Sequence, residues 1–331
     1  MASLISNSNA FAHPISTAST YIYPGMRLAF IKLHIAIVLA GFTAILGRLI
    51  SLQEVALVWW RLLISVAALA LLALWQQKSI RQAPAVALRL LGIGALVGLH
   101  WVCFFGSIKY GNVSIALVCF SAAGFFSALL EPLMGSRRLM LVELALGLLC
   151  MLGIYIIFHF DSQYKLGIAL GVASAALSAL FNILNKKIVM AQVSGLAMTT
   201  YEMTGALATL TLLLPLYGWL RGDSFMPQGL DWLWLLCLAL ACTVWAFILQ
   251  LQALRYITAV TLNLSYNLEP VYGILLAFLF FQENQYLGPG FYAGMALIAA
   301  SVGIQMVRVS RQYKNNQLQP QHGLEAARGT E

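Results

Sequence analysis

The sequence predicts an all-α integral membrane protein with ten transmembrane helices, arranged as two inverted repeats of five helices each. The first observation is composition: 61% of the 331 residues are hydrophobic and only 9% are charged, against about a quarter in a soluble domain. The second is a succession of apolar runs of about 20 residues, the length of a membrane-spanning helix. The third is an internal duplication with an odd number of spans in each half.

The apolar runs follow one another almost from end to end, with short connections. The mean hydropathy is +0.85, and the alternating polar and apolar pattern of β-barrel strands is absent from the sequence. No segment is left for a sizeable soluble domain. The predicted spans are residues 28–50, 53–75, 88–109, 113–134, 139–160, 166–190, 196–220, 231–254, 259–281 and 286–307.

The chain divides into two repeats and two polar ends. No Lys or Arg precedes Arg27, so the basic start of a signal peptide is missing. The last residues are polar and carry no recognisable binding motif. The predicted organisation is a polar tail over 1–27, a first five-helix repeat over 28–160, a second over 166–307, and a polar cytoplasmic tail over 308–331.

The net charge of +8 is interpreted as membrane topology rather than as affinity for nucleic acid. Lys and Arg gather in cytoplasmic loops. With the N-terminus inside, most of the basic residues fall on the cytoplasmic side. We therefore expect a multi-pass protein of the plasma (inner) membrane with both termini cytoplasmic. The outer segments would hold only Arg48, Lys109, Lys165 and Arg221.

The five cysteines all lie inside predicted spans. No pair has the spacing of a metal site, and no disulfide framework is indicated. They are best interpreted as small packing residues. We expect neither a metal nor a cofactor.

The duplication is visible in short matching segments. Lys109-Tyr110 aligns with Arg255-Tyr256 at a shift of 146 residues, and Arg61 in "WWR" aligns with Glu202 in "TYE" at a shift of 141. Because each half has five helices, the second half must enter the membrane from the opposite side. Inverted repeats of this kind recur in transporters, with the substrate near the midplane where the repeats meet.

These segments resemble the EamA-type transporters of the drug/metabolite transporter superfamily. The resemblance is carried by "SIKYGNVSIA" (107–116), "ALRYITAV" (253–260), Glu269-Pro270, Phe281-Gln282-Glu283 and Arg61, over residues 30–307. It implies a secondary transporter, often an exporter of amino acids or other small metabolites. The family often has a second proline in span four, where this chain has Gly124, so we expect the first repeat to bend differently.

Span nine carries polar residues at mid-membrane depth. Glu269 lies ten residues from the start of the span, about 15 Å deep at 1.5 Å per residue. Pro270 removes one backbone donor and breaks the helix. Asn263 and Asn267 fall on a different helical face from Glu269, and we assign them to contacts between helices. Glu269 either serves substrate or proton binding, or caps the backbone groups that the break leaves free.

Four further residues are candidates for the same cavity. His100, beside Trp101, is either a packing residue or a group that titrates with Glu269 in proton coupling. Arg61 either binds a carboxylate or phosphate of the substrate or reaches outward as an anchor. Glu202 lies on the other side of the midplane from Arg61, so no salt bridge between them is expected.

Aromatic residues of span nine complete the candidate site. Tyr266 and Tyr272 are placed in the wall of a pocket for a partly apolar ligand, although aromatics in membranes often only pack. Glu283, at the outer turn before span ten, is interpreted as solvated and structural.

The predicted function is export of a small polar metabolite, amino-acid-like or another organic compound, by alternating access. Because no ATP-binding loop is present in the sequence, we expect coupling to protons or to exchange. A lipid or lipid-linked-sugar translocator is the alternative within transport. An intramembrane enzyme is the alternative of another class, but no catalytic motif supports it, and we predict no enzymatic activity. The expected partners are a small-molecule substrate and the lipid bilayer; the sequence does not specify an oligomer.

Overall fold

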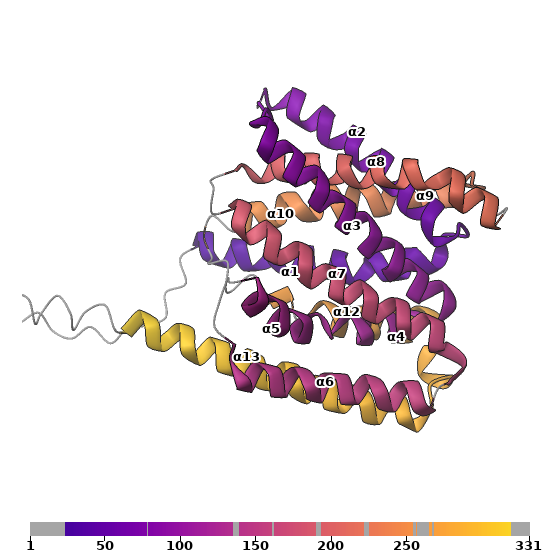
Figure 1. The fold of residues 1–331 in the computed structure, drawn as a ribbon, viewed down its shortest axis with the longest axis vertical. Helices are drawn as coiled ribbons and strands as arrows, with labels where there is room; N and C mark the ends of the chain where they lie inside the picture. Colours follow the sequence, from indigo (N-terminus) through magenta and orange to yellow (C-terminus); the bar gives the residue numbers. More distant parts are fainter. Residues whose placement is uncertain are drawn as a thin grey trace, which may run out of the picture.

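The structure is a computed structural model that describes residues 24–318, except 78, 135–138, 161, 190–192, 222–224, 254–255, 257–264 and 267. Helices run roughly along one common direction and are joined by short connections (Figure 1). Within the described ranges no strand occurs. The all-helical class predicted from the sequence is therefore confirmed for this part of the chain.

Six helices occur in the described part of the first half. Pro84 stands in the first turn of its helix, where its missing N–H has no intrahelical role, and the Asn112 side chain accepts from Ile115 N to cap another helix start. The helices are α1 (Pro24–Leu49), α2 (Glu54–Trp75), α3 (Pro84–Tyr110), α4 (Val113–Phe120), α5 (Ala123–Leu133) and α6 (Leu141–Phe160).

The described part of the second half is also helical and includes a π-helical segment. Gln282, with φ 53°, ends a helix in the left-handed conformation. The elements are η1 (Ser162–Tyr164), α7 (Lys165–Val189), α8 (Gly195–Arg221), α9 (Asp231–Leu236), the π-helix η2 (Cys237–Trp245), α10 (Ala246–Ala253), α12 (Glu269–Phe281), η3 (Glu283–Gln285) and α13 (Pro289–Leu318).

Eight helical segments of the described chain are long and apolar enough to cross a membrane, and Glu269–Phe281 is a shorter apolar helix. The remaining predicted span, 196–220, coincides with α8. The predicted span 259–281 is described only in part, and Asn263 and Asn267 lie outside the described residues. The total of ten therefore stays a prediction, as does the division into domains.

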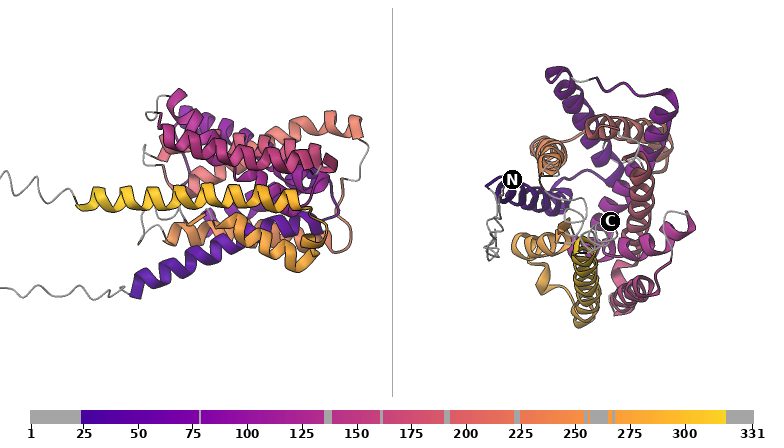
Figure 2. Two further views of the ribbon diagram at one scale, coloured as in Figure 1. Left: turned by 90° about the horizontal axis from the view of Figure 1, so that it is seen from below. Right: turned by 90° about the vertical axis from the view of Figure 1, so that its left-hand side faces the viewer.

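The two ends of the bundle differ in what they hold. We call the end where α1 begins and α13 finishes the proximal end, and the opposite end, where α1, α3 and α12 finish, the distal end (Figure 2). α6 and α13 lie side by side along one edge of the bundle (Figure 1), where a Cβ on Gly153 would stand 2.6 Å from Gly294 O. Only glycine permits so close an approach of two backbones.

Both repeats contain a helix that breaks at matching positions. In the second repeat Leu268 N donates to Ser265 O at 3.0 Å, and Tyr272 N donates to Leu268 O at 3.0 Å. In the first repeat the same pattern occurs 146 residues earlier: Ala122 N donates to Cys119 O at 3.1 Å, and Phe126 N donates to Ala122 O at 3.1 Å. The equivalence of the two breaks extends the duplication from sequence to backbone.

The first repeat breaks at the matching position although it has no proline there, and the device that produces the break is different. The Ser121 hydroxyl donates to Leu117 O at 3.3 Å, while Ser121 N turns to Val118 O at 3.1 Å. The hydroxyl thus takes the carbonyl that the backbone N–H of Ser121 would bond in a regular helix, an arrangement that bends helices. Pro270 itself falls in the first turn of α12, so it begins a new helix and does not kink a continuous one.

Candidate functional site

Arg61 is the buried charge at the centre of the candidate site. It lies on α2, and only 3% of its surface is exposed. Its Nε donates to Thr243 Oγ1 at 3.1 Å, and its guanidinium carbon lies 3.7 Å from the centroid of the Trp101 ring. The Nη1 atom is buried and has no hydrogen-bond partner in the described protein. Arg61 is therefore fixed on two sides and unsatisfied on the third.

A π-helix places Thr243 against Arg61. The segment η2 has the wider i to i−5 spacing, and the Thr243 hydroxyl donates to Leu238 O, five residues earlier, at 2.9 Å. Its proton is thereby used, so its lone pairs are available to accept from Arg61 Nε. Short π-helical segments are frequent at functional sites. Sequence analysis missed Thr243, because the apolar run "CLALACTVW" carries no signal for a π-helix.

Glu269, from the second repeat, lies within electrostatic reach of Arg61. It is the first residue of α12, directly after the break, and the charges of Glu269 and Arg61 interact electrostatically. No direct ion pair joins these two side chains in the described part of the protein. Each repeat thus contributes one charge, of opposite sign, to the same region.

His100 is held in a packing arrangement. Its Nδ1 lies 2.9 Å from Ser174 O and 2.9 Å from Ser174 Oγ. Since a carbonyl only accepts, Nδ1 carries the proton and donates. The imidazole ring also lies among the rings of Phe104, Phe120 and Phe181. The geometry therefore favours the packing interpretation, in which His100 fastens α3 to α7.

The two tyrosines lie in a different cluster from Arg61. Tyr266 and Tyr272 both pack against a small buried cluster formed by α1 and Ala253 of α10; its α1 members are Ala29, Leu33 and Ile37. The Tyr266 hydroxyl donates to Gln250 Oε1 at 3.1 Å. Of the predicted cavity residues, the structure therefore places Trp101, His100 and Glu269 within electrostatic reach of Arg61. The two tyrosines pack towards α1, although Tyr266 also interacts electrostatically with Glu269.

Glu202 is buried in another part of the protein. Only 6% of its surface is exposed, and its side chain hydrogen-bonds Asn185 on α7. Its backbone lies so close to α3 that a Cβ on Gly94 would stand 2.1 Å from Glu202 O. No ion pair joins Glu202 to Arg61 in the described protein, as the inverted topology led us to expect.

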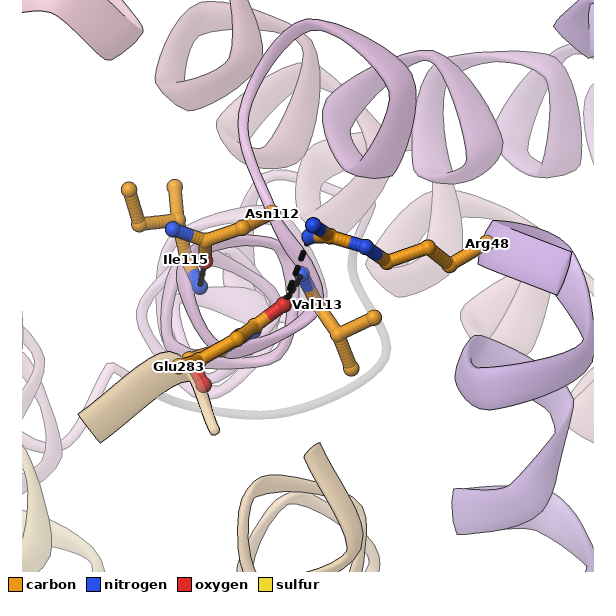
Figure 3. Close-up of polar contacts among 6 residues, drawn as sticks. Arg48, Asn112, Val113, Ile115 and Glu283 are labelled. Atoms are coloured by element: carbon orange, nitrogen blue, oxygen red, sulfur yellow. Dashed lines mark hydrogen bonds and ion pairs between the residues drawn. The ribbon is translucent and has the colours of Figure 1, made fainter. Parts of the chain in front are cut away.

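Glu283 is buried, and its interpretation as a solvated residue is wrong. Only 2% of its surface is exposed. Its Oε1 forms an ion pair with Arg48 Nη1 at 2.8 Å (Figure 3). The carboxylate also accepts from Val113 N at 3.1 Å and from Ser114 N at 2.9 Å. It thus satisfies free N–H groups at the start of α4, and this long-range partnership could not be read from its position at a turn.

Comparison with known proteins supports the duplication. The sequence matches the family described as the EamA-like transporter family twice, over residues 27–159 and 165–307. The chain belongs to the EamA-like transporter family. It is therefore a multi-pass membrane transporter of the drug/metabolite superfamily, built as an inverted repeat, and the family consists of transporters rather than enzymes.

One solved structure, described only as a crystal structure of a protein, has the same fold as this EamA-like transporter. The TM-score is 0.57 at 20% sequence identity, and the match covers 86% of this chain and 99% of the other. At this identity the likeness concerns the fold alone. No curated protein matches the sequence.

Proposed function

We propose that this EamA-like transporter exports a small polar metabolite bearing an anionic group, and that Arg61 binds that group. Transport proceeds by alternating access and is driven by protons or by exchange. The substrate is amino-acid-like or another organic acid. The membrane is the plasma membrane, both termini are cytoplasmic, and the distal end faces outside.

The observation that carries this proposal is the unsatisfied Nη1 atom of Arg61. A buried polar atom of a charged group that makes no hydrogen bond costs about 1–3 kcal/mol or more, so the free Nη1 calls for an acceptor. The planar guanidinium presents its donors as a fork that matches a carboxylate or phosphate. A substrate anion would supply the acceptors that the described protein does not give to Nη1.

The surroundings of Arg61 suit a binding role better than an anchoring role. Trp101 covers one face of the guanidinium, and Thr243 holds Nε. Both contacts fix the orientation of the group before any ligand arrives, which lowers the entropic cost of binding. An anchor that reaches for the membrane surface would instead place its charged end in water.

Glu269 gives the site a second charge. In the absence of substrate its carboxylate offsets the charge of Arg61, with which it interacts. With substrate present, Glu269 can receive an ammonium group of a zwitterion or a proton. Either event links substrate binding to a second cation, which is what proton-driven transport or exchange requires.

The test compares metabolites in medium and cytosol of cells that express the wild type, Arg61→Lys or Arg61→Gln at matched membrane levels. We expect a metabolite to accumulate outside only with the wild type, and to bear a carboxylate or phosphate. Arg308→Lys is the matched control, since Arg308 is also partly buried but pairs with Glu143 on α6.

Two results would overturn the proposal. One is that Arg61→Gln exports the same metabolite at the wild-type rate. The other is that the enriched compound is neutral and that Arg61→Lys and Arg308→Lys affect its export equally. Absence of any exported metabolite would contradict constitutive export and favour uptake, to be measured as flux into reconstituted vesicles.

A further inference from the structure

The loop between α1 and α2, residues 50–53, is packed into the distal end of the protein. Ile50 is fully buried and Leu52 is 3% exposed, whereas Ser51 between them is exposed. Connecting loops ordinarily run over the surface with their backbone in water. This loop instead inserts two apolar side chains into the bundle, so specific contacts must hold its polar groups.

The first contact joins the loop to the second repeat through Asp231. Ser51 donates twice to this carboxylate: its backbone N to Oδ1 at 2.7 Å and its hydroxyl to Oδ2 at 2.5 Å. Gln228 N also donates to Asp231 Oδ2, at 3.3 Å. Asp231 is 4% exposed, and hydrogen bonds to a charged acceptor are stronger than those between neutral groups.

The second contact holds the end of α1, just before the loop. Arg48 pairs with Glu283, which at the same time caps the start of α4. A third contact comes from within the first repeat, where Lys109 Nζ donates to Ile50 O. Both carboxylates that hold the loop and its flank, Asp231 and Glu283, belong to the second repeat, whereas the loop belongs to the first.

The loop lies next to the candidate binding site along the chain. α2 begins at Glu54, and Arg61 follows seven residues later, about 10 Å along the helix axis at 1.5 Å per residue. A movement that separates the loop from Asp231, and Arg48 from Glu283, removes two of the contacts that hold the chain just before α2, the helix that carries Arg61. The loop thus connects directly to the helix that carries Arg61.

We propose that the loop 50–53 is a gate at the distal end, and that Asp231 and Glu283 hold it closed in the conformation seen here. The inference rests on the proposed function in one respect, that the region around Arg61 is the site to which the gate controls access. Opening the site to the distal side breaks the Ser51–Asp231 and Arg48–Glu283 contacts, which join the two repeats only while the gate is shut.

A native cysteine reports the opening. Cys242 precedes Thr243 in the π-helix, is 8% exposed, and interacts electrostatically with Arg61. An anionic, membrane-impermeant methanethiosulfonate, added to the distal side of sealed vesicles of known orientation, would label Cys242 only when the gate is open. Mass spectrometry of the Cys242 peptide measures the rate, and Cys242→Ala identifies the labelled residue.

We expect Asp231→Asn and Glu283→Gln to label Cys242 about tenfold faster than the wild type, because each replaces charge-assisted hydrogen bonds with weaker neutral ones. Glu143→Gln is the matched control, since it removes a buried carboxylate from the Arg308 ion pair near the proximal end. It should label at the wild-type rate. Wild-type rates in both gate variants, or an equal increase in Glu143→Gln, would overturn the proposal.

A double-cysteine variant tests the gate by locking it shut instead of releasing it. It also keeps the proposal testable if the Asp231 or Glu283 variants do not fold. Ser51→Cys with Asp231→Cys places two thiols at positions whose side chains now hydrogen-bond each other, and oxidation tests whether they form a disulfide. Oxidation should suppress labelling of Cys242, and reduction should restore it; labelling that is insensitive to the cross-link would refute the gate. The assay needs no substrate, so a failure of the gate remains distinct from a failure of anion binding at Arg61.

Discussion

Arg61 and Trp101, on neighbouring helices of the first repeat, form a cation–π contact in which the guanidinium carbon lies 3.7 Å from the ring centroid. The Phe105 ring lies further away on the same guanidinium, at 5.7 Å. The ring faces attract the positive charge of Arg61 but accept no conventional hydrogen bond from it. The donors at the edge of the guanidinium are therefore left for other acceptors, including a ligand.

Replacing Trp101 tests this contact. A desolvated cation–π contact contributes about 2 kcal/mol, so Trp101→Leu should weaken binding of an anionic substrate about tenfold or more. Trp101→Phe retains a ring, so we expect it to weaken substrate binding less than Trp101→Leu does. The measurement is the concentration dependence of transport in reconstituted vesicles. Equal loss in both variants would contradict a role for the ring itself.

Replacing Thr243 tests the orientation of Arg61. Thr243→Val has nearly the same shape but leaves Arg61 Nε without its acceptor in a buried environment, at a cost of about 1–3 kcal/mol. We expect a lower melting temperature in detergent and weaker substrate binding. Thr243→Ser keeps the hydroxyl and should restore both. If valine and serine behave alike, the hydrogen bond to Arg61 is unimportant.

The sequence predicts the parts of this protein that depend on local composition. Apolar runs predict the helices, the matching segments predict the repeat, and a charge inside an apolar run identifies Arg61 and Glu269. The partners of these residues are not local: Thr243 lies 182 positions from Arg61, and Glu283 lies 235 positions from Arg48. Such pairs depend on how the helices pack against one another, and the apolar periodicity of a single helix does not encode that packing.

Backbone irregularities are predicted only in part. Pro270 marks the break in the second repeat because proline lacks a donor. The equivalent break in the first repeat depends on the Ser121 hydroxyl and Leu117 O, and serine within a helix usually causes no break. The position of one break in the sequence, combined with the 146-residue shift, would have located the other more reliably than the residue types did.

Replacing His100 distinguishes packing from proton coupling. Since Nδ1 donates to Ser174 O and the ring lies among phenylalanines, His100→Leu should lower the melting temperature by removing the link from α3 to α7. The pH dependence of transport should stay the same. A flat pH profile in His100→Leu, with normal expression, would instead assign proton coupling to this residue.

Replacing Glu269 tests the charge opposite Arg61. Glu269→Gln keeps the size of the side chain and removes its charge, so Arg61 loses the carboxylate with which it interacts. We expect the variant to fold and to insert in the membrane but to lose net transport, because the site can no longer accept a proton or an ammonium group. The measurement is transport across a pH range, beside size-exclusion chromatography of the purified protein.

Glu202→Gln is the matched control for this prediction. Glu202 is also a buried carboxylate, but it hydrogen-bonds Asn185, and an amide at the same position can preserve that contact. Transport by Glu202→Gln should therefore be reduced less than transport by Glu269→Gln. Unchanged transport and pH dependence in Glu269→Gln would refute the role of its charge, and loss of folding in that variant would show instead that Glu269 stabilises the break before α12.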